Sequence, residues 1–259
     1  MKKTLLLAAT IAGLCGGPLC AQQPSPPAIS AQELAAKLDA VGQGNATIRT
    51  RLEVRSNDGS KRVLQLLIKR RRTKTTTDLA YLVLWPNDQK NKAVILHQDA
   101  GEAPTGSLID PPDHVRALKS SQMGEGLFDS DLSYQDAVEN FFAWKNQALV
   151  GSGMVGNVKC QILESKPQSS SESIYGKVRS WIDPTRLLPM RVEKYSRAGE
   201  LVRRIDTDRV TRDQHHHPIP SRLIVHGPRK NTVTELSGAS IKQDMTFSDA
   251  DFTPASVAR

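Results

Sequence analysis

The sequence predicts a mainly β protein of the α+β class, built around one large antiparallel sheet. Three observations indicate this class. Segments of alternating apolar and charged residues fill most of the chain, turn residues separate them, and few segments have the period of a helix. No internal repeat of about 20 to 50 residues is present, which argues against a propeller or a solenoid.

The expected elements follow the chain as helix, long meander, short helices and long meander. Ser30 and Glu33 have the spacing of a capping box, and the helix that they begin should end at Gly42 and Gly44. About ten strands are expected from the period-two pattern. They cover residues 48–55, 63–68, 75–85, 92–97, 158–165, 176–183, 188–196, 200–207, 220–226 and 232–241.

The middle of the chain interrupts the strands. We expect a Pro-rich loop over Gly106–Asp113, a short helix within Val115–Gly126 and a second helix within Ser130–Asn146. That second helix should start near Ser133 and carry Ala137, Phe141 and Trp144. Strands such as Leu79–Trp85 are apolar on both faces, so apolar groups must cover each side of part of the sheet. A sheet of this size has to curl or carry a covering layer.

The first residues have the layout of a secretory signal. Met1-Lys2-Lys3 is positive, Leu5–Leu14 is apolar, and small residues lead to Ala21. The apolar run is shorter than the roughly 20 residues that span a bilayer. We predict a signal peptide over residues 1–21, a disordered leader over 22–29, and a single domain over 30–259 that works outside the cytoplasm. A retained N-terminal anchor is the alternative.

The cysteines bear on how the mature chain is attached. Cys15 and Cys20 lie in the signal, and each follows a bulky Leu where a lipoprotein signal has a small residue. A freely diffusing product is therefore favoured, and a membrane-tethered lipoprotein is the alternative. Cys160 alone remains in the mature chain, so an internal disulfide is impossible and the fold must rely on its core.

The basic charge narrows the possible partners. The net charge of +8 becomes +6 when Lys2 and Lys3 leave with the signal. Such a surface attracts nucleic acid or anionic lipid, and export makes nucleic acid the weaker candidate. The run Lys69–Lys74 is the densest in charge. It predicts either a solvated hairpin end or a docking surface for phospholipid head groups or an acidic partner.

Three segments resemble motifs of enzymes or metal sites, but each departs from its motif. Gly151–Gly156 matches a dinucleotide fingerprint by its letters, but β-like sequence follows, so a glycine-rich hairpin turn is expected. Adjacent histidines at His215–His217 point in different directions and make a poor metal site. Asp129–Asp136 lacks the Gly and Glu of a calcium loop, and helix capping by Ser133 or Asp131 explains it better. We expect no enzyme activity, no metal and no cofactor.

The second half of the chain resembles a known family. Trp181-Ile182-Asp183, Arg191–Ser196 and Gly199-Glu200-Leu201 resemble the signature hairpin of outer-membrane lipoprotein-sorting proteins of the LolA-like type. Gly126–Asp136 resembles the central acidic-aromatic segment of that family, and Val150–Pro167 resembles its intervening hairpin. The resemblance covers residues 30–253. The aromatic content of 5% is lower than is usual in the family.

The resemblance implies a half-open antiparallel β-barrel with short helices covering the concave face. It also implies an apolar cavity, no catalytic residues, and a periplasmic carrier of lipid or lipoprotein acyl chains. An inner-membrane transporter and an outer-membrane acceptor would be its partners. The alternatives are a non-enzymatic accessory or sensor module of a cell-envelope transporter, and a hydrolase with an unfamiliar site. Candidate cavity residues, which could equally be plain core, are Leu82, Leu84, Trp85, Ile95, Phe128, Phe141, Trp181 and Met190.

Overall fold

The computed structural model describes residues 29–112, 114–228 and 231–257. The predicted signal peptide and nearly all of the predicted leader lie outside these residues. Within the described part of the chain, every helix is too short or too polar to cross a membrane.

One antiparallel sheet of thirteen strands forms the body of the protein, so the predicted fold class is confirmed. Its spatial order is β6-β5-β4-β3-β2-β1-β13-β12-β11-β10-β9-β8-β7. The strands are β1 (Gly44–Ser56), β2 (Lys61–Arg72), β3 (Thr76–Trp85), β4 (Ala93–Asp99), β5 (Thr105–Asp110), β6 (His114–Ala117), β7 (Asn146–Val155), β8 (Val158–Lys166), β9 (Lys177–Asp183), β10 (Leu188–Tyr195), β11 (Leu201–Arg212), β12 (Pro218–His226) and β13 (Thr232–Gln243).

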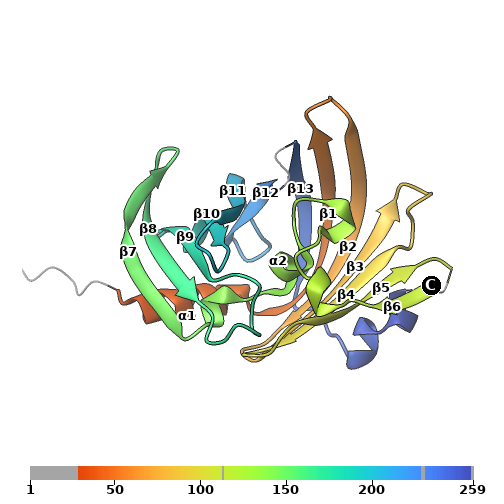
Figure 1. Cartoon of the computed structure of the whole chain (residues 1–259), viewed down its shortest axis with the longest axis horizontal. Coiled ribbons are helices and arrows are strands. Elements are labelled where there is room, and N and C mark those ends of the chain that lie inside the picture. The colour runs from red at the N-terminus through yellow and green to blue at the C-terminus, as the bar shows by residue number, and fades with distance from the viewer. Residues whose placement is uncertain (1–28, 113, 229–230, 258–259) are drawn as a thin grey trace, which may run out of the picture.

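The sheet curves without closing, and β6 and β7 are its two edges (Figure 1). The first meander, β1–β6, and the second, β7–β13, join where β1 pairs with β13. The chain crosses between the meanders inside the curve, through residues 118–145, which we call the central segment. We call the face of the sheet toward this segment the inner face.

Short helices lie mostly inside the curve (Figure 1). The helix α1 (Ala31–Gly42) begins as predicted, because the Ser30 hydroxyl accepts a hydrogen bond from the Glu33 N–H at 3.1 Å. Its buried residues pack on Leu163 and Ile182 of the second meander. The central segment holds η1 (Ser120–Gln122), η2 (Leu127–Asp129), α2 (Tyr134–Val138) and η3 (Phe141–Ala143).

A C-terminal pair of helices covers the outer face instead. The segment η4 (Asp249–Phe252) and α3 (Pro254–Val257) packs against Ala80, Ala93 and Ile95. This accounts for the strands that are apolar on both faces. Leu79, Tyr81 and Val83 of β3 pack toward the central segment, and the alternate residues of the same strand pack under Phe252 and Val257.

The predictions for the middle of the chain were right only in part. The expected loop over Gly106–Asp113 contains the strand β5. The short helix expected within Val115–Gly126 is present as η1, but it follows the strand β6. Gly106 is required inside the strand, because a Cβ there would lie 2.7 Å from the Ile95 carbonyl oxygen. Its role is close packing, whereas the sequence suggested a turn.

The second expected helix and the expected turn also differ from the structure. The helix stops at Val138, and Phe141 lies in the separate turn η3. Gly151 and Gly153 belong to β7, and the hairpin turns at Gly156-Asn157. A Cβ at Gly153 would lie 3.2 Å from Trp181 Nε1, so this glycine makes room for the indole.

Candidate functional site

The inner face of the first meander is an apolar surface that the central segment covers. Leu52, Leu64, Leu66, Tyr81 and Val94 are buried there. They belong to one cluster with residues of the central segment, namely Met123, Leu127, Tyr134 and Val138. A surface of this kind, covered by a single irregular segment, is the candidate binding surface.

A buried ionic cluster fixes the central segment to the second meander. Lys194 of β10 is 1% exposed, and its ammonium lies 2.9 Å from Asp136 Oδ1 and 3.1 Å from Glu139 Oε2. Arg203 of β11 lies 2.8 Å from Asp136 Oδ2 and donates through Nε to the Asp131 carbonyl at 2.6 Å. Tyr175 donates to Asp136 Oδ1 at 2.8 Å. The cluster therefore bridges α2, two strands and the loop before β9.

The charges in this cluster oppose the effect of burial. Burial alone would raise the pKa of Asp136, but the charges of Lys194 and Arg203 outweigh it and lower that pKa to about 2. For Glu139 burial prevails over the attraction of Lys194, and its pKa is raised. Burial would lower the pKa of Lys194, but the two carboxylates raise it. A carboxylate and an ammonium are thus kept charged in the interior.

Other polar contacts hold the same segment along its length. Arg62 of β2 donates to the Phe128 carbonyl. Both carboxylate oxygens of Asp131 accept from β13, from Thr232 and Thr234 at 2.8 Å each. Phe128 itself has φ 49° and ψ 46°, a left-handed conformation that costs free energy for a bulky residue. Polar contacts with both meanders thus add to the apolar packing of the central segment.

Ser133 caps α2, as one of the two sequence interpretations proposed. Its hydroxyl accepts from the Asp136 N–H at 3.0 Å, and Asp136 accepts in return from the Ser133 N–H. The residues that carried the family resemblance, Asp136 and Lys194, are therefore partners in one structural cluster. The sequence signal for Lys194 is its phase, because it continues the buried positions Met190 and Val192 of β10.

Comparisons with known proteins show the family to which this chain belongs. A family model whose description reads uncharacterized protein matches residues 75–259, which is more than half of the chain. The chain belongs to that family. No curated protein sequence gives a significant match.

Solved structures identify the fold as LolA-like. A DUF1329 family protein from Desulfovibrio piger has a TM-score of 0.79 at 19% identity, over 88% of this chain and 97% of that one. A domain from Vibrio parahaemolyticus, named for a predicted role as an outer membrane lipoprotein-sorting protein, has a TM-score of 0.79 at 17% identity, over 88% and 98%. A LolA superfamily protein from Nitrosomonas europaea has a TM-score of 0.70 at 16% identity, over 87% and 98%.

The eight residues expected to line a cavity do not come together in this LolA-like fold. Leu82 and Ile95 face outward and pack beneath the C-terminal helices. Trp85 is 48% exposed at the end of β3, and Leu84 precedes it with partial burial. These four lie at or beyond the outer face of the first meander, away from the central segment.

The other four lie in three separate clusters. Phe128 packs on the inner-face core of the first meander. Phe141 packs with Trp144, Val178 and Val192. Trp181 and Met190 lie together with Cys160. Phe128 is the member of the set that contacts the candidate binding surface.

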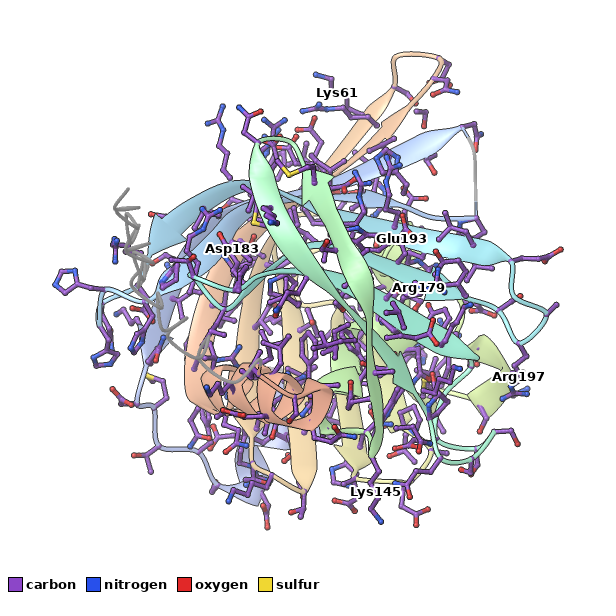
Figure 2. The ribbon with its side chains drawn as sticks, turned by 90° about the vertical axis from the view of Figure 1, so that its left-hand side faces the viewer. Lys61, Lys145, Arg179, Asp183, Glu193 and Arg197 are labelled. Carbon is purple, nitrogen blue, oxygen red and sulfur yellow. The ribbon has the colours of Figure 1, made fainter. Side chains whose placement is uncertain are left out.

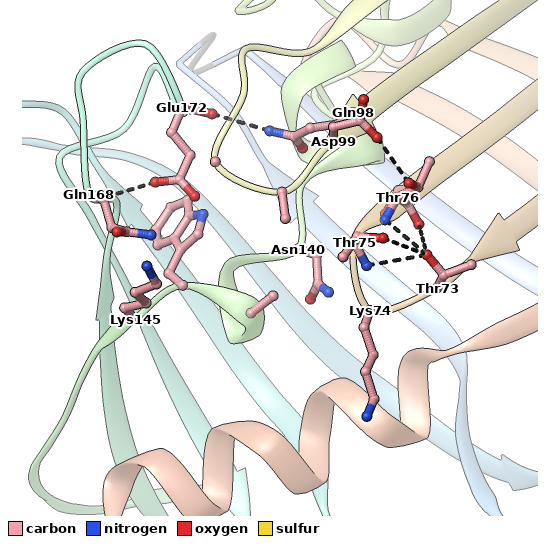
Figure 3. A pocket seen from close by; sticks show the side chains of 15 residues that line it. Thr73, Lys74, Thr75, Thr76, Gln98, Asp99, Asn140, Lys145, Gln168 and Glu172 are labelled. Carbon is pink, nitrogen blue, oxygen red and sulfur yellow. Dashed lines mark hydrogen bonds between the residues drawn. The ribbon is translucent and has the colours of Figure 1, made fainter.

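Two cavities beside the central segment are small and partly polar. One of about 180 Å³ lies between the β2–β3 turn and the residues around Trp144, with Lys74, Asn140, Lys145 and Glu172 in its lining (Figure 3). Another of about 160 Å³ lies under Phe128 and Tyr134. Both fall below the roughly 300 Å³ at which small-molecule sites begin. Neither of these two cavities is large enough for a long acyl chain.

Charged side chains form pairs on the outer face of the second meander. Arg179 and Glu193 are cross-strand partners and lie toward the viewer in Figure 2. Arg179 also pairs with Glu164 at 2.8 Å, and Arg191 pairs with Asp206 at 2.6 Å. Among the described residues, no group of three or more His, Cys, Asp or Glu side chains is placed to hold a metal ion.

Proposed function

We propose that this protein is a periplasmic carrier that binds the acyl chains of a lipid or lipoprotein on the inner face of its sheet. The observation that supports this proposal is the apolar surface formed by Leu52, Leu64 and Leu66, which the central segment covers. The likeness to the lipoprotein-sorting domain from Vibrio parahaemolyticus supports it at the level of fold.

The proposed mechanism is an exchange of apolar contacts. Burial of apolar surface contributes about 25 cal/mol per Å², whether the covering groups are protein or acyl chain. A chain that replaces Phe128 and its neighbours against the sheet therefore restores most of the burial that it disrupts. The polar contacts of Asp131 and Asp136 with the second meander would keep the displaced segment attached. No step of this mechanism requires catalysis.

The proposed function also requires a location and partners in the cell envelope. The signal pattern over residues 1–21 and the single domain over residues 30–259 fit a protein that works in the periplasm. A donor in the inner membrane and an acceptor in the outer membrane would supply and take the chains.

Lipid extraction from the purified mature protein, followed by mass spectrometry, tests the proposal. We expect co-purified amphiphiles, and we expect the stripped protein to take up a fluorescent fatty acid. The variant Phe128→Ala should change uptake, and Val115→Ala on the exposed edge strand β6 is a matched control. Protein free of lipid, with no uptake in any variant, would exclude a carrier. Capture of a transporter without lipid would support an accessory or sensor module.

A further inference from the structure

The basic run at the end of β2 is divided by the strand into two chemically different pairs. Lys69 and Arg71 point to the outer face, where the C-terminal segment neutralises them. Lys69 lies 3.0 Å from Asp251, and Arg71 lies 2.8 Å from both Asp78 and Asp249. The acidic partner that the sequence suggested for this run is, for these two residues, the protein's own C-terminal segment.

Arg70 and Arg72 point to the inner face. They continue the alternation of Leu64, Leu66 and Ile68, which belong to the inner-face core. Along β2 the inner face thus changes from apolar to cationic. That sequence of surfaces is complementary to an amphiphile with an acyl chain and an anionic head group.

Neither inward arginine has a carboxylate partner within ion-pair distance among the described residues. Arg70 Nε is buried and has no hydrogen-bond acceptor. Arg72 donates through Nε to the Thr77 hydroxyl at 3.2 Å, which is a neutral partner. Asp39 acts on Arg72 from a greater distance, and its own oxygens accept from Gln43 at 2.9 Å and Asn140 at 2.7 Å.

The tyrosine beside the two arginines also offers a donor. Tyr81 pairs with Ile68 across the β2–β3 ladder, and Ile68 is two residues from Arg70 on the same face of β2. The Tyr81 side chain is 7% exposed. Its hydroxyl makes no hydrogen bond to any described residue. Burial lowers the pKa of Arg70, and burial with the charge of Arg70 lowers the pKa of Arg72 to about 10. Uncompensated positive charge in a partly buried site is costly without an anion.

We propose that Arg70, Arg72 and Tyr81 form a binding site for the anionic head group, carboxylate or phosphate, of an amphiphile. This inference rests on the proposed carrier function and adds the chemistry of the ligand. Two guanidinium groups and a hydroxyl can donate several charge-assisted hydrogen bonds to one group of oxygens. The neighbouring apolar positions of β2 would receive the chain.

The test compares two amphiphiles of equal chain length that differ in charge. Hexadecanoate and hexadecanol are titrated into the wild type, into Arg70→Gln/Arg72→Gln, and into Lys69→Gln/Arg71→Gln, which removes the same charge from the outer face. We expect the inward pair of substitutions to weaken hexadecanoate binding about tenfold or more, as for lost hydrogen bonds to a charged group. Hexadecanol binding should change less than about twofold, and the outward pair should leave the preference for the acid unchanged.

Two further measurements keep the inference separable from the proposed function. Inorganic phosphate should compete with hexadecanoate and not with hexadecanol, because it would occupy the head-group site and leave the apolar surface free. In the absence of ligand, Arg70→Met should be at least as stable as the wild type, whereas a structural arginine would be lost at a cost. Equal binding of acid and alcohol would overturn the head-group site alone. Binding of neither would overturn the carrier function and the site with it.

Discussion

The ammonium of Lys194 lies 2.9 Å from the Asp136 carboxylate, and both groups are inaccessible to solvent. This contact joins the central segment to the middle of the second meander, across 58 residues of sequence (194 − 136 = 58). It gives the covering segment a fixed position, although the segment contains only short helical turns.

Replacing Lys194 by Met should destabilise the protein by about 3–5 kcal/mol, the usual cost of leaving a buried charge without its partner. Asp136 keeps Arg203, but Glu139 loses its cation. Urea unfolding at neutral pH measures the loss. Lys177→Met on the neighbouring strand is the control and should cost less than about 1 kcal/mol, since that lysine lies 3.9 Å from Glu164 near the surface. Equal stability of Lys194→Met and the wild type would show that the cluster does not hold the segment.

Acid should remove the stabilising effect of Asp136. The lowered pKa of about 2 means that its contribution is present above the unfolded value of 3.8 and lost as the pH falls toward 2. The contribution is on the order of 2 kcal/mol. Unfolding free energies measured from pH 5 to pH 2 should therefore fall more steeply for the wild type than for Asp136→Asn. Parallel curves for the two proteins would contradict the lowered pKa.

Rising pH should weaken the contact of His97 with Asp78. The hydrogen bond from His97 Nδ1 to Asp78, at 2.7 Å, raises the pKa of the imidazole above 6.5. A raised pKa stabilises the fold below the unfolded value, and the effect is lost as the pH rises through the folded value. Melting temperatures between pH 6 and pH 9 should decline in the wild type, and His97→Gln should lack that part of the decline. A variant that declines equally would place the effect elsewhere.

Substitutions at Ile95 and Phe128 should affect stability and ligand binding differently. Ile95 is 7% exposed under the C-terminal helices, so Ile95→Ala should cost about 2–5 kcal/mol and leave fatty acid uptake of the folded protein unchanged. Phe128 contacts the inner-face core, so Phe128→Ala should alter uptake. The fluorescent fatty acid assay and thermal unfolding check both variants. Reduced uptake in Ile95→Ala at a temperature where it is folded would move the binding surface to the outer face.

Much of the sheet could be predicted because it depends on local patterns. The alternation in segments such as Val63–Ile68 and the cap at Ser30 depend on neighbours within a few residues, and the structure reproduces both. The elements that were mistaken depend on distant partners. Gly106 reads as a turn residue, yet it is needed where a strand passes close to the Ile95 carbonyl. The helix from Ser133 ends early, where the Glu139 side chain is bound by Lys194 of another strand.

For the candidate site too, some features could be predicted from the sequence and others depend on the tertiary structure. The sequence by itself determined the mainly β class and the likeness of Asp136 and Lys194 to a family pattern. The alternation of side chains along a strand places Leu82 and Tyr81 on opposite faces of the sheet. Both faces are apolar in sequence, so the alternation alone does not identify the inner face. The tertiary structure decided this, because the C-terminal helices cover the side of Leu82 and the central segment covers the side of Tyr81. It likewise decided that Lys69 and Arg71 meet carboxylates from a segment distant in sequence, whereas Arg70 and Arg72 meet none among the described residues.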